Sequence, residues 1–284
     1  MIFPNTTWQA ASVAHHYDEL DALYRELWGE HLHHGLWMTG NETPEEATQQ
    51  LLALVAQRAG VLPGAPVCDA GSGYGAGARW LAQECAAQVT ALTVSSAQFA
   101  YARAQTLPQN SARPIYLLQD WLNNSLPTQA FDAVLAIEST EHMADKHRCC
   151  AEAFRVLRPN GRFVICAWLA REAPRAWEAR HLLEPICREG RLAGLGSVSE
   201  YRELLQGAGF VVESCEEAGA QVQRTWTIVI RRMLRGLATK RHYWRYILDR
   251  QQRERIFAWT ALRMWLAYRL GTLRYGIITA RRPG

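Results

Sequence analysis

The chain has 284 residues, of which 49% are hydrophobic and 20% are charged, so it can bury the core of a large domain. No apolar stretch reaches the ~18 residues that a membrane-spanning helix needs, and the first five residues lack the basic start of a signal peptide. We therefore expect a cytoplasmic protein made of one domain, or of one domain with a lid.

The cysteines and histidines show no pattern typical of a metal centre. Seven cysteines are an odd number, and none lies at Cys-x-x-Cys or Cys/His ligand spacing. The histidines at positions 31, 33 and 34 have no partner carboxylate or cysteine set at ligand spacing. We expect reduced thiols and no metal.

The net charge of +4 is distributed unevenly. Residues 1–220 carry 16 Lys and Arg against 25 Asp and Glu, a balance of −9, whereas residues 221–284 carry 15 against 2, a balance of +13. Arginines alternating with tryptophans, as they do here, occur in membrane-surface helices, nucleic-acid faces, pockets for anionic substrates and solvated helices alike. Nucleic acid is not expected, because the rest of the chain is acidic and lacks an Asn-Pro-Pro-Tyr-like base-flipping motif. Peripheral membrane contact through the basic C-terminal region stays open.

The first 60 residues are predicted to form a helical lid. Apolar residues recur at helical spacing over 14–28, which predicts one helix there. The sequence Thr43-Pro-Glu-Glu46 is a capping-box start with Pro at the first helical position, and it predicts a second helix that ends near Gly60.

From residue 61 onward the pattern alternates between strand and helix. Strands are expected at 66–70, 89–93, 115–118, 132–137 and 162–168, helices near 76–86, 96–106 and 146–157, and a turn at 157–161. Such alternation predicts an α/β fold with a mostly parallel sheet and helices on both faces.

The last third of the chain is predicted to add helices to this sheet. Residues 172–196 are helical in pattern and indicate an inserted cap at about 170–205, which includes a helix at 198–205. A strand follows at 209–214, an amphipathic stretch at 241–270 and a last strand at 272–279. The basic, aromatic-rich region 221–270 is expected to be helical.

The segment Pro66-Val-Cys-Asp-Ala-Gly-Ser-Gly-Tyr-Gly75 reads as a buried strand followed by a glycine turn. Asp69 ends this strand, where open α/β sheets bind ligands. The glycines also fit the dinucleotide fingerprint, but residues 91–98 lack the acidic residue that such a site uses for the ribose hydroxyls. A carboxylate beside the turn would repel a pyrophosphate and attract the amino group of a sulfonium amino acid. The segment therefore favours an adenosyl sulfonium ligand over a dinucleotide.

This glycine motif resembles the first motif of class I S-adenosylmethionine-dependent methyltransferases, which implies their Rossmann-like fold for residues 61–284. Ser72 stands where the family often has Cys. Further segments are similar to the γ-tocopherol methyltransferase-like subgroup, in family order: Tyr17-Asp-Glu19 with Trp28-Gly-Glu-His-Leu-His-His-Gly35, Leu92-Thr-Val-Ser-Ser-Ala-Gln98, Glu138-Ser-Thr-Glu-His-Met-Ala-Asp-Lys146 and Leu273-Arg-Tyr-Gly-Ile-Ile-Thr-Ala-Arg281.

The resemblance implies S-adenosyl-L-methionine as cofactor. The implied cofactor-binding residues follow the strands in four groups: Asp69, Gly71, Ser72, Gly73 and Gly75 for the amino-acid end, Thr93, Val94, Ser95 and Gln98 for the ribose, Asp120 and Trp121 for the adenine, and Glu138 beside the methyl donor. Alternatively, Thr93, Ser95 and Asp120 cap helices and Trp121 is a core aromatic.

Four residues are predicted to act in catalysis: Glu138, His142, His34 and Tyr17. His142 could take a proton from a hydroxyl or amine near neutral pH, and Glu138 could orient the donor or remove a proton. Alternatively, Glu138 and the neighbouring Glu141 are helix-start carboxylates and His142 is a surface histidine. His34, His33 and Tyr17 are expected to line the acceptor side from the lid or to make structural hydrogen bonds.

These implications predict methyl transfer to a lipophilic small molecule, on carbon, oxygen or nitrogen, in specialised metabolism. One alternative is C-methylation of a prenyl diphosphate held by C-terminal arginines. A more distant alternative is a nucleic-acid methyltransferase or binder.

Overall fold

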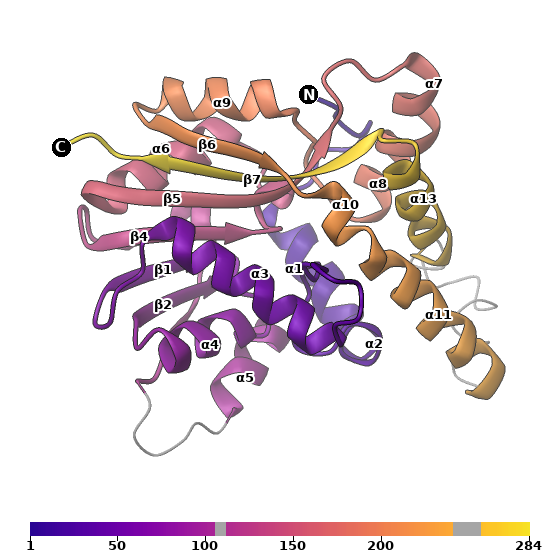
Figure 1. Ribbon diagram of the computed structural model, residues 1–284, viewed down its shortest axis with the longest axis horizontal. Helices are drawn as coiled ribbons and strands as arrows, with labels where there is room; N and C mark the ends of the chain where they lie inside the picture. Colours follow the sequence, from indigo (N-terminus) through magenta and orange to yellow (C-terminus); the bar gives the residue numbers. More distant parts are fainter. Residues whose placement is uncertain (106–111, 241–256) are drawn as a thin grey trace.

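A computed structural model describes residues 1–105, 112–240 and 257–284. In this part of the chain, seven strands form one sheet with the order β3-β2-β1-β4-β5-β7-β6, in which β7 runs antiparallel to both of its neighbours (Figure 1). The strands are β1 (Pro66–Ala70), β2 (Gln88–Thr93), β3 (Ile115–Leu118), β4 (Phe131–Ile137), β5 (Leu157–Ala170), β6 (Val211–Glu217) and β7 (Leu273–Arg281). The predicted α/β fold with a mostly parallel sheet is confirmed.

Helices cover both faces of the sheet, and each face has its own apolar core. One core joins α3 to the sheet through Leu51 and Val164, and the other joins α6 to it through Ala153 and Ile165, all four completely buried. The helices and turns, in chain order, are α1 (Ala10–Glu19), α2 (Asp21–Leu27), α3 (Pro44–Ala59), α4 (Ala76–Glu84), α5 (Ser96–Ala104), η1 (Trp121–Asn123), η2 (Thr140–His142), α6 (Lys146–Val156), α7 (Ala176–Glu178), the π-helical η3 (Ala179–Leu183), α8 (Glu184–Glu189), α9 (Val198–Gly207), α10 (Gly219–Val222), α11 (Arg224–Thr239) and α13 (Phe257–Arg269).

The strands of the first half lie where the sequence predicts them, but β5 begins earlier than expected. Residues 157–161, predicted as a turn, already belong to β5, and Leu157 pairs with Phe131 across an irregularity in the register. Asn160 has a φ of +64° there. The turn-forming residues therefore produce a local distortion inside the strand.

The predicted helix over 14–28 is two helices. The chain bends at Leu20, which has non-helical dihedrals (φ −94°, ψ 5°) and is almost fully buried. The bend separates α1 from α2 and places the Leu20 side chain in the protein interior. The capping box at Thr43 is confirmed, and α3 ends at Gly60 with a φ of +67°, as expected for a left-handed C-terminal residue.

The C-terminal region packs helices at the edge of the sheet where the parallel strands end (Figure 1). α11 and α13 belong to the basic region 221–270; the predicted amphipathic stretch 241–270 falls partly outside the described residues, at 241–256. Within the described ranges, none of the helices is long and apolar enough to cross a membrane. The division of the chain into a lid, 1–60, and a domain, 61–284, stays an interpretation.

Candidate functional site

The glycine turn after β1 forms one wall of a pocket at the carboxyl ends of the parallel strands. Gly71 has a φ of +103°, and a Cβ atom there would lie 2.4 Å from the Cβ of Ser139. Gly75 has a φ of +73°, and its Cβ would lie 2.6 Å from a ring carbon of Tyr116. Gly71, Gly73 and Ser72 all line the pocket, whereas Gly75 does not. The turn therefore requires glycine for both conformation and space.

The hydroxyl group of Ser72 indicates that the pocket binds a ligand. Its hydroxyl oxygen is buried and has no hydrogen-bond partner among the described residues. Because a buried polar atom without a partner is costly, a bound group that hydrogen-bonds here would remove that cost. The amino-acid end of the predicted cofactor carries such groups, so the turn fits it.

Asp69 lies behind the turn rather than in the pocket wall. Its side chain is buried, and burial raises the pKa of its carboxyl group to about 7. The carboxylate Oδ2 lies 3.9 Å from where a Cβ on Gly77 would stand, and Gly77 does line the pocket. The predicted contact with the cofactor's amino group stays a prediction.

The loop after β2 forms the second wall. Thr93, Val94 and Gln98 line the pocket, and the Thr93 hydroxyl donates to Oε1 of Gln98 at 2.8 Å. Ser95 does not line it; its Oγ accepts from the backbone N–H of Gln98 at 3.1 Å and is the N-terminal cap of α5. For Ser95 the structure therefore shows the alternative capping role.

Asp120 and Trp121 both line the pocket beyond β3. Asp120 also caps η1, because its Oδ1 accepts from the backbone N–H of Leu122 at 3.0 Å. The Trp121 ring is buried and its Nε1 donates to the Cys149 carbonyl at 3.2 Å. The predicted contact with the adenine and the alternative structural roles are compatible, since each residue makes a structural hydrogen bond and also lines the pocket.

Glu138 is the centre of a buried hydrogen-bond network. It follows β4 with a φ of +51°, which strains a residue other than glycine. Its Oε1 accepts from the His34 backbone N–H (2.7 Å) and the Tyr275 hydroxyl (2.8 Å), and its Oε2 lies 2.9 Å from His34 Nδ1 and 2.8 Å from Trp168 Nε1. Burial alone would raise the pKa of Glu138, but the contacts with His34 outweigh it and lower this pKa. With four donors on two oxygens, the carboxylate is a fixed acceptor.

His34 is held by a similar set of contacts. Its Nε2 lies 2.7 Å from Nε1 of Trp226, and an indole nitrogen can only donate. Nε2 is therefore the unprotonated nitrogen, and Nδ1 carries the proton that it donates to Glu138. Both ring nitrogens are occupied, so the structure agrees with the structural hydrogen bond that was the alternative for His34.

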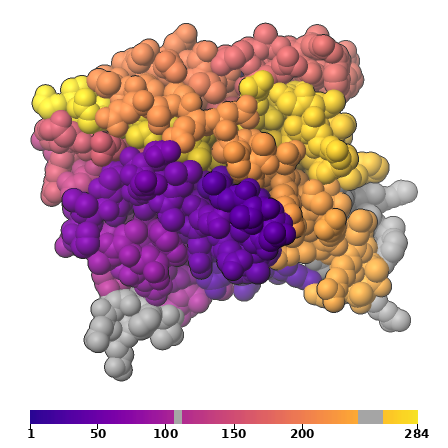
Figure 2. Space-filling view, viewed as in Figure 1, coloured from indigo at the N-terminus to yellow at the C-terminus, as the bar shows by residue number. Residues whose placement is uncertain are grey.

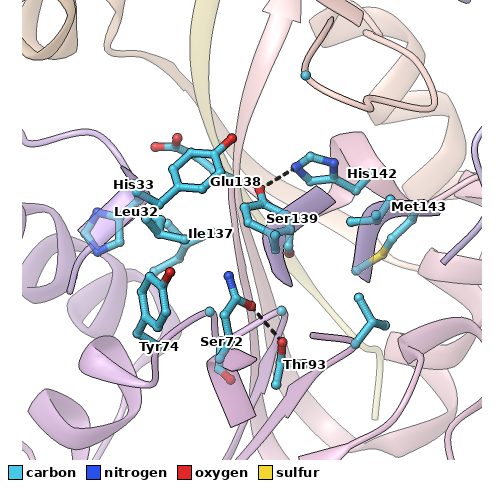
Figure 3. Close-up of a pocket in the computed structure, with 18 of the residues that line it drawn as sticks. Leu32, His33, Ser72, Tyr74, Thr93, Ile137, Glu138, Ser139, His142 and Met143 are labelled. Carbon is cyan, nitrogen blue, oxygen red and sulfur yellow. Dashed lines mark hydrogen bonds between the residues drawn. The ribbon is translucent and has the colours of Figure 1, made fainter. Parts of the chain in front are cut away.

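His142 has a different environment. Its Nδ1 lies 3.1 Å from the Arg191 carbonyl oxygen, which can only accept, so Nδ1 is protonated and Nε2 is the acceptor. Nε2 accepts from the Tyr17 hydroxyl at 3.0 Å. Burial lowers the pKa of His142 to about 4 and raises that of Tyr17. His142 is therefore a neutral base, held in one tautomer, on the pocket wall rather than on the surface (Figure 3).

Glu141, three residues after Glu138, does not line the pocket. It is almost completely buried, and its Oε1 accepts from the Trp168 backbone N–H at 2.6 Å. Burial raises its pKa to about 7. Its contacts give it a role in holding β5.

The pocket lining is rich in aromatic side chains and includes no Lys or Arg among the described residues. Figure 3 shows His33 and His142 on opposite sides of Glu138, with Ser72 and Thr93 below them. Among the described residues that line the pocket, none is Lys or Arg, and the acidic ones are Glu30, Asp120 and Glu138. The described chain also holds no cluster of three or more His, Cys, Asp or Glu side chains arranged to bind a metal. The tyrosines and tryptophans that line the pocket are Tyr17, Tyr24, Trp28, Tyr74, Trp121, Trp168 and Trp226.

Sequence reasoning missed several residues of this site. Trp168 and Tyr275 lie on β5 and β7, and the sequence holds no signal that singles them out as partners of Glu138. Trp226 lies in the basic region, where the sequence does not distinguish it from the other tryptophans that alternate with arginines. Asp18, which contacts the loop after β2, belongs to the Tyr17-Asp-Glu19 segment, but its role depends on a contact 77 residues away.

Comparisons with known proteins agree with the geometry. A family model described as "Methyltransferase domain" matches residues 68–165. The chain is 32% identical to 27-O-demethylrifamycin SV methyltransferase of Amycolatopsis mediterranei over 74% of this chain and 78% of that protein. It is 29% identical to the chloroplastic tocopherol O-methyltransferase of Arabidopsis thaliana over 95% and 82%. The crystal structure of mycolic acid cyclopropane synthase CmaA1 with SAH and CTAB has the same fold, with a TM-score of 0.85, 20% identity and coverage of 98% and 99%.

Proposed function

Because the chain belongs to the class I S-adenosylmethionine-dependent methyltransferases, we propose that it methylates a hydroxyl group of a lipophilic small molecule in specialised metabolism. The observation that carries this proposal is the tautomer of His142, whose unprotonated Nε2 faces the pocket and already accepts from one hydroxyl, that of Tyr17. A base is needed when the nucleophile must lose a proton, as a hydroxyl does. Two relatives named above carry an O-methyl position in their names.

The pocket walls support a lipophilic and uncharged acceptor. Aromatic side chains from α1, α2, β5 and α11 line the same pocket as His142. Such rings bind apolar scaffolds by area and shape. An anionic acceptor would find no Lys or Arg among the described lining residues.

Each side chain has one proposed task. The cofactor, when bound, supplies an electrophilic methyl group on its sulfonium. His142 takes the hydroxyl proton of the acceptor at Nε2, Tyr17 positions that hydroxyl, and Glu138 holds the pocket wall in place through its four donors. Aromatic walls exclude water from the reacting atoms.

The acceptor class is tested by incubating the purified protein and S-adenosylmethionine with prenyl phenols, polyketide phenols, indole amines and prenyl diphosphates, and reading product masses. We expect a gain of one methyl on phenols and none on amines or diphosphates. Methylation of amines alone would contradict a hydroxyl acceptor while leaving methyl transfer intact.

Methylation of a prenyl diphosphate, the alternative, has less support. Its diphosphate would need guanidinium or ammonium groups facing the pocket. The described lining offers none, and the arginines between 241 and 256 lie outside the described residues. The acceptor panel separates the two possibilities directly.

The basic C-terminal region offers a surface for an anionic membrane, and we propose that it delivers the acceptor from there. Four apolar side chains on or just after α13, each between 41% and 64% exposed, recur at helical spacing: Trp259, Leu262, Leu266 and Leu270. Residues 221–284 have a balance of +13, which complements an anionic lipid surface. The same helices bring Trp226 and Thr260 to the pocket wall. Figure 2 shows α11 of this region beside the N-terminal part of the chain.

Vesicle co-sedimentation tests this surface. We expect the protein to pellet with vesicles containing phosphatidylserine but not with neutral ones, and the double variant Leu262→Ser/Leu266→Ser to stay in the supernatant. Leu62→Ser, which changes a more exposed leucine elsewhere (69% exposed), is the matched control. Equal pelleting of all variants would contradict the proposal.

A cytoplasmic location also remains a proposal. It is supported by the seven cysteines, all of which are free thiols in the structure. Titration of the freshly purified, unfolded protein should count seven thiols, and a lower number would argue against a reducing compartment.

A further inference from the structure

Asp18 joins the N-terminal helices to the loop that follows β2. Its Oδ1 accepts from the Ser95 hydroxyl at 2.5 Å and from the Ala97 backbone N–H at 3.1 Å, and its Oδ2 accepts from the Ser96 hydroxyl at 2.8 Å. Three donors at the start of one helix thus converge on a single carboxylate. Although burial acts in the opposite direction, these hydrogen bonds lower the pKa of Asp18.

This contact lies at the predicted ribose end of the cofactor pocket. Thr93, Val94 and Gln98 of the same loop line the pocket, and Ser95 is completely buried between them and Asp18. Residues 91–98 contain no acidic residue of their own. Asp18 brings a carboxylate to this loop from a helix that is distant in the sequence, and the negative charge suits the N-terminus of α5.

A second carboxylate makes a parallel contact with the glycine turn. Oδ1 of Asp21 accepts from the Tyr74 hydroxyl at 2.8 Å, and the Tyr74 ring is almost completely buried. Asp18 and Asp21 lie on either side of the bend at Leu20. The N-terminal helices are therefore attached to both loops that are predicted to hold the cofactor.

The same helices form part of the pocket wall. Tyr17 of α1 and Tyr24 of α2 line the pocket. A movement of α1 away from the pocket would break the contacts of Asp18, and a disordered loop after β2 would leave α1 without its anchor. The position of the loop after β2 and the position of α1 therefore depend on each other through the contacts of Asp18.

We propose that Asp18 is a positioning residue for the cofactor, which couples the packing of the N-terminal helices to the geometry of the ribose-binding loop. A ligand that fits the ordered loop stabilises the packed helices, and the packed helices raise the affinity for the ligand by the same factor. This inference rests on cofactor use by the family and does not depend on the identity of the acceptor.

The test compares Asp18→Asn with wild type. The variant keeps the shape but removes the negative charge, so the charge-assisted hydrogen bonds from Ser95, Ser96 and Ala97 become weaker neutral ones. We expect the Kd for S-adenosylhomocysteine, measured by calorimetry, to rise about tenfold, a change of about 1.4 kcal/mol. At saturating cofactor, kcat should stay within about a factor of three, because Asp18 does not line the pocket. Asp18→Glu, which retains the charge, should recover part of the affinity.

Glu19→Gln is the matched control, since Glu19 is the next residue and contacts only His15 among the described ion pairs. It should bind the cofactor like wild type. Ser96→Ala removes one exposed donor and should raise Kd by about two- to threefold, which keeps the test decisive even if Asp18→Asn fails to fold. An unchanged Kd in a folded Asp18→Asn variant, or in Ser96→Ala if the former is unfolded, would overturn the proposal. A lower unfolding temperature of the free protein with normal affinity would likewise show a purely structural contact.

Discussion

The hydroxyl oxygen of Tyr17 lies 3.0 Å from Nε2 of His142, 125 residues further along the chain. This contact closes the pocket between α1 and the turn η2. It also shows that Nε2 can accept a hydrogen bond from a hydroxyl group. A hydroxyl group of the methyl-accepting substrate that replaced the Tyr17 hydroxyl would meet the same unprotonated nitrogen. This contact is the geometric basis for the proposal that Nε2 takes the hydroxyl proton of the acceptor.

Removing the base should affect turnover far more than cofactor binding. General-base catalysis contributes about 10²- to 10⁴-fold, so His142→Ala should lower kcat by at least about 100-fold on a phenolic acceptor. Tyr17→Phe removes only the positioning hydroxyl, and we expect about a tenfold loss. Steady-state kinetics and calorimetry of cofactor binding check both variants. A kcat of His142→Ala near wild type would exclude His142 as the base.

The pH profile gives an independent test of the same residue. Burial lowers the pKa of His142 to about 4, so the imidazole is neutral throughout the range near pH 7. At saturating cofactor, where the titration of Asp69 no longer limits binding, kcat/KM for the acceptor should therefore fall only as the pH drops through about 4. The unfolded chain takes up this proton at about 6.5, so the stability that His142 contributes is present above pH 6.5 and is lost between 6.5 and 4. An acid limb near 6.5 in kcat/KM would contradict the buried, neutral histidine.

The sheet and its carboxyl-end edge were predictable from the sequence because their signals are local. The runs at 66–70 and 132–137 are short and mostly apolar, and each brings a carboxylate to the edge, because Asp69 lies near the end of the first run and Glu138 directly follows the second. A glycine turn and a capping box each depend on a few adjacent residues. Such features need no knowledge of distant contacts.

The network around Glu138 was not predictable, because its partners come from four separate parts of the chain. His34 is 104 residues away and Tyr275 is 137 residues away. Nothing in the local sequence distinguishes Trp168 or Trp226 from other buried tryptophans. For the same reason the sequence left His34 with two roles, and the structure shows it both lining the pocket and hydrogen-bonded to Glu138 and Trp226.

Glu138→Gln should cost stability rather than only activity. The amide replaces one acceptor oxygen by a donor, so donors from His34, Trp168 or Tyr275 lose their partner inside the protein. Leaving buried partners of a charged group unsatisfied costs about 3 kcal/mol in the free energy of unfolding. Denaturant unfolding measures this loss.

Asp132→Asn is the matched control for that substitution. It makes the same chemical change in an exposed ion pair with Arg158, where we expect a loss below about 1 kcal/mol. Equal stability of the two variants would mean that the network around Glu138 does not hold the pocket wall together.

Cofactor affinity should depend on pH through Asp69. Burial raises its carboxyl pKa to about 7, so in the unliganded protein the group is largely protonated at pH 6, whereas the ammonium group of the cofactor needs the carboxylate. Binding therefore releases a proton below pH 7. The Kd should rise by up to about tenfold per pH unit between 7 and 5.5, where the ligand's amino group stays protonated, and level off above 7.

Asp69→Asn separates this effect from other titrations. It should weaken binding at pH 7.5 by about 10- to 100-fold and make the Kd independent of pH between 5.5 and 7. Calorimetry in buffers with different ionisation enthalpies measures the released proton directly. His142, with a pKa of about 4, stays neutral over this range, and Glu141 does not line the pocket, so neither should produce the slope. If the pH dependence survives in Asp69→Asn, the carboxylate behind the glycine turn does not hold the cofactor's amino group.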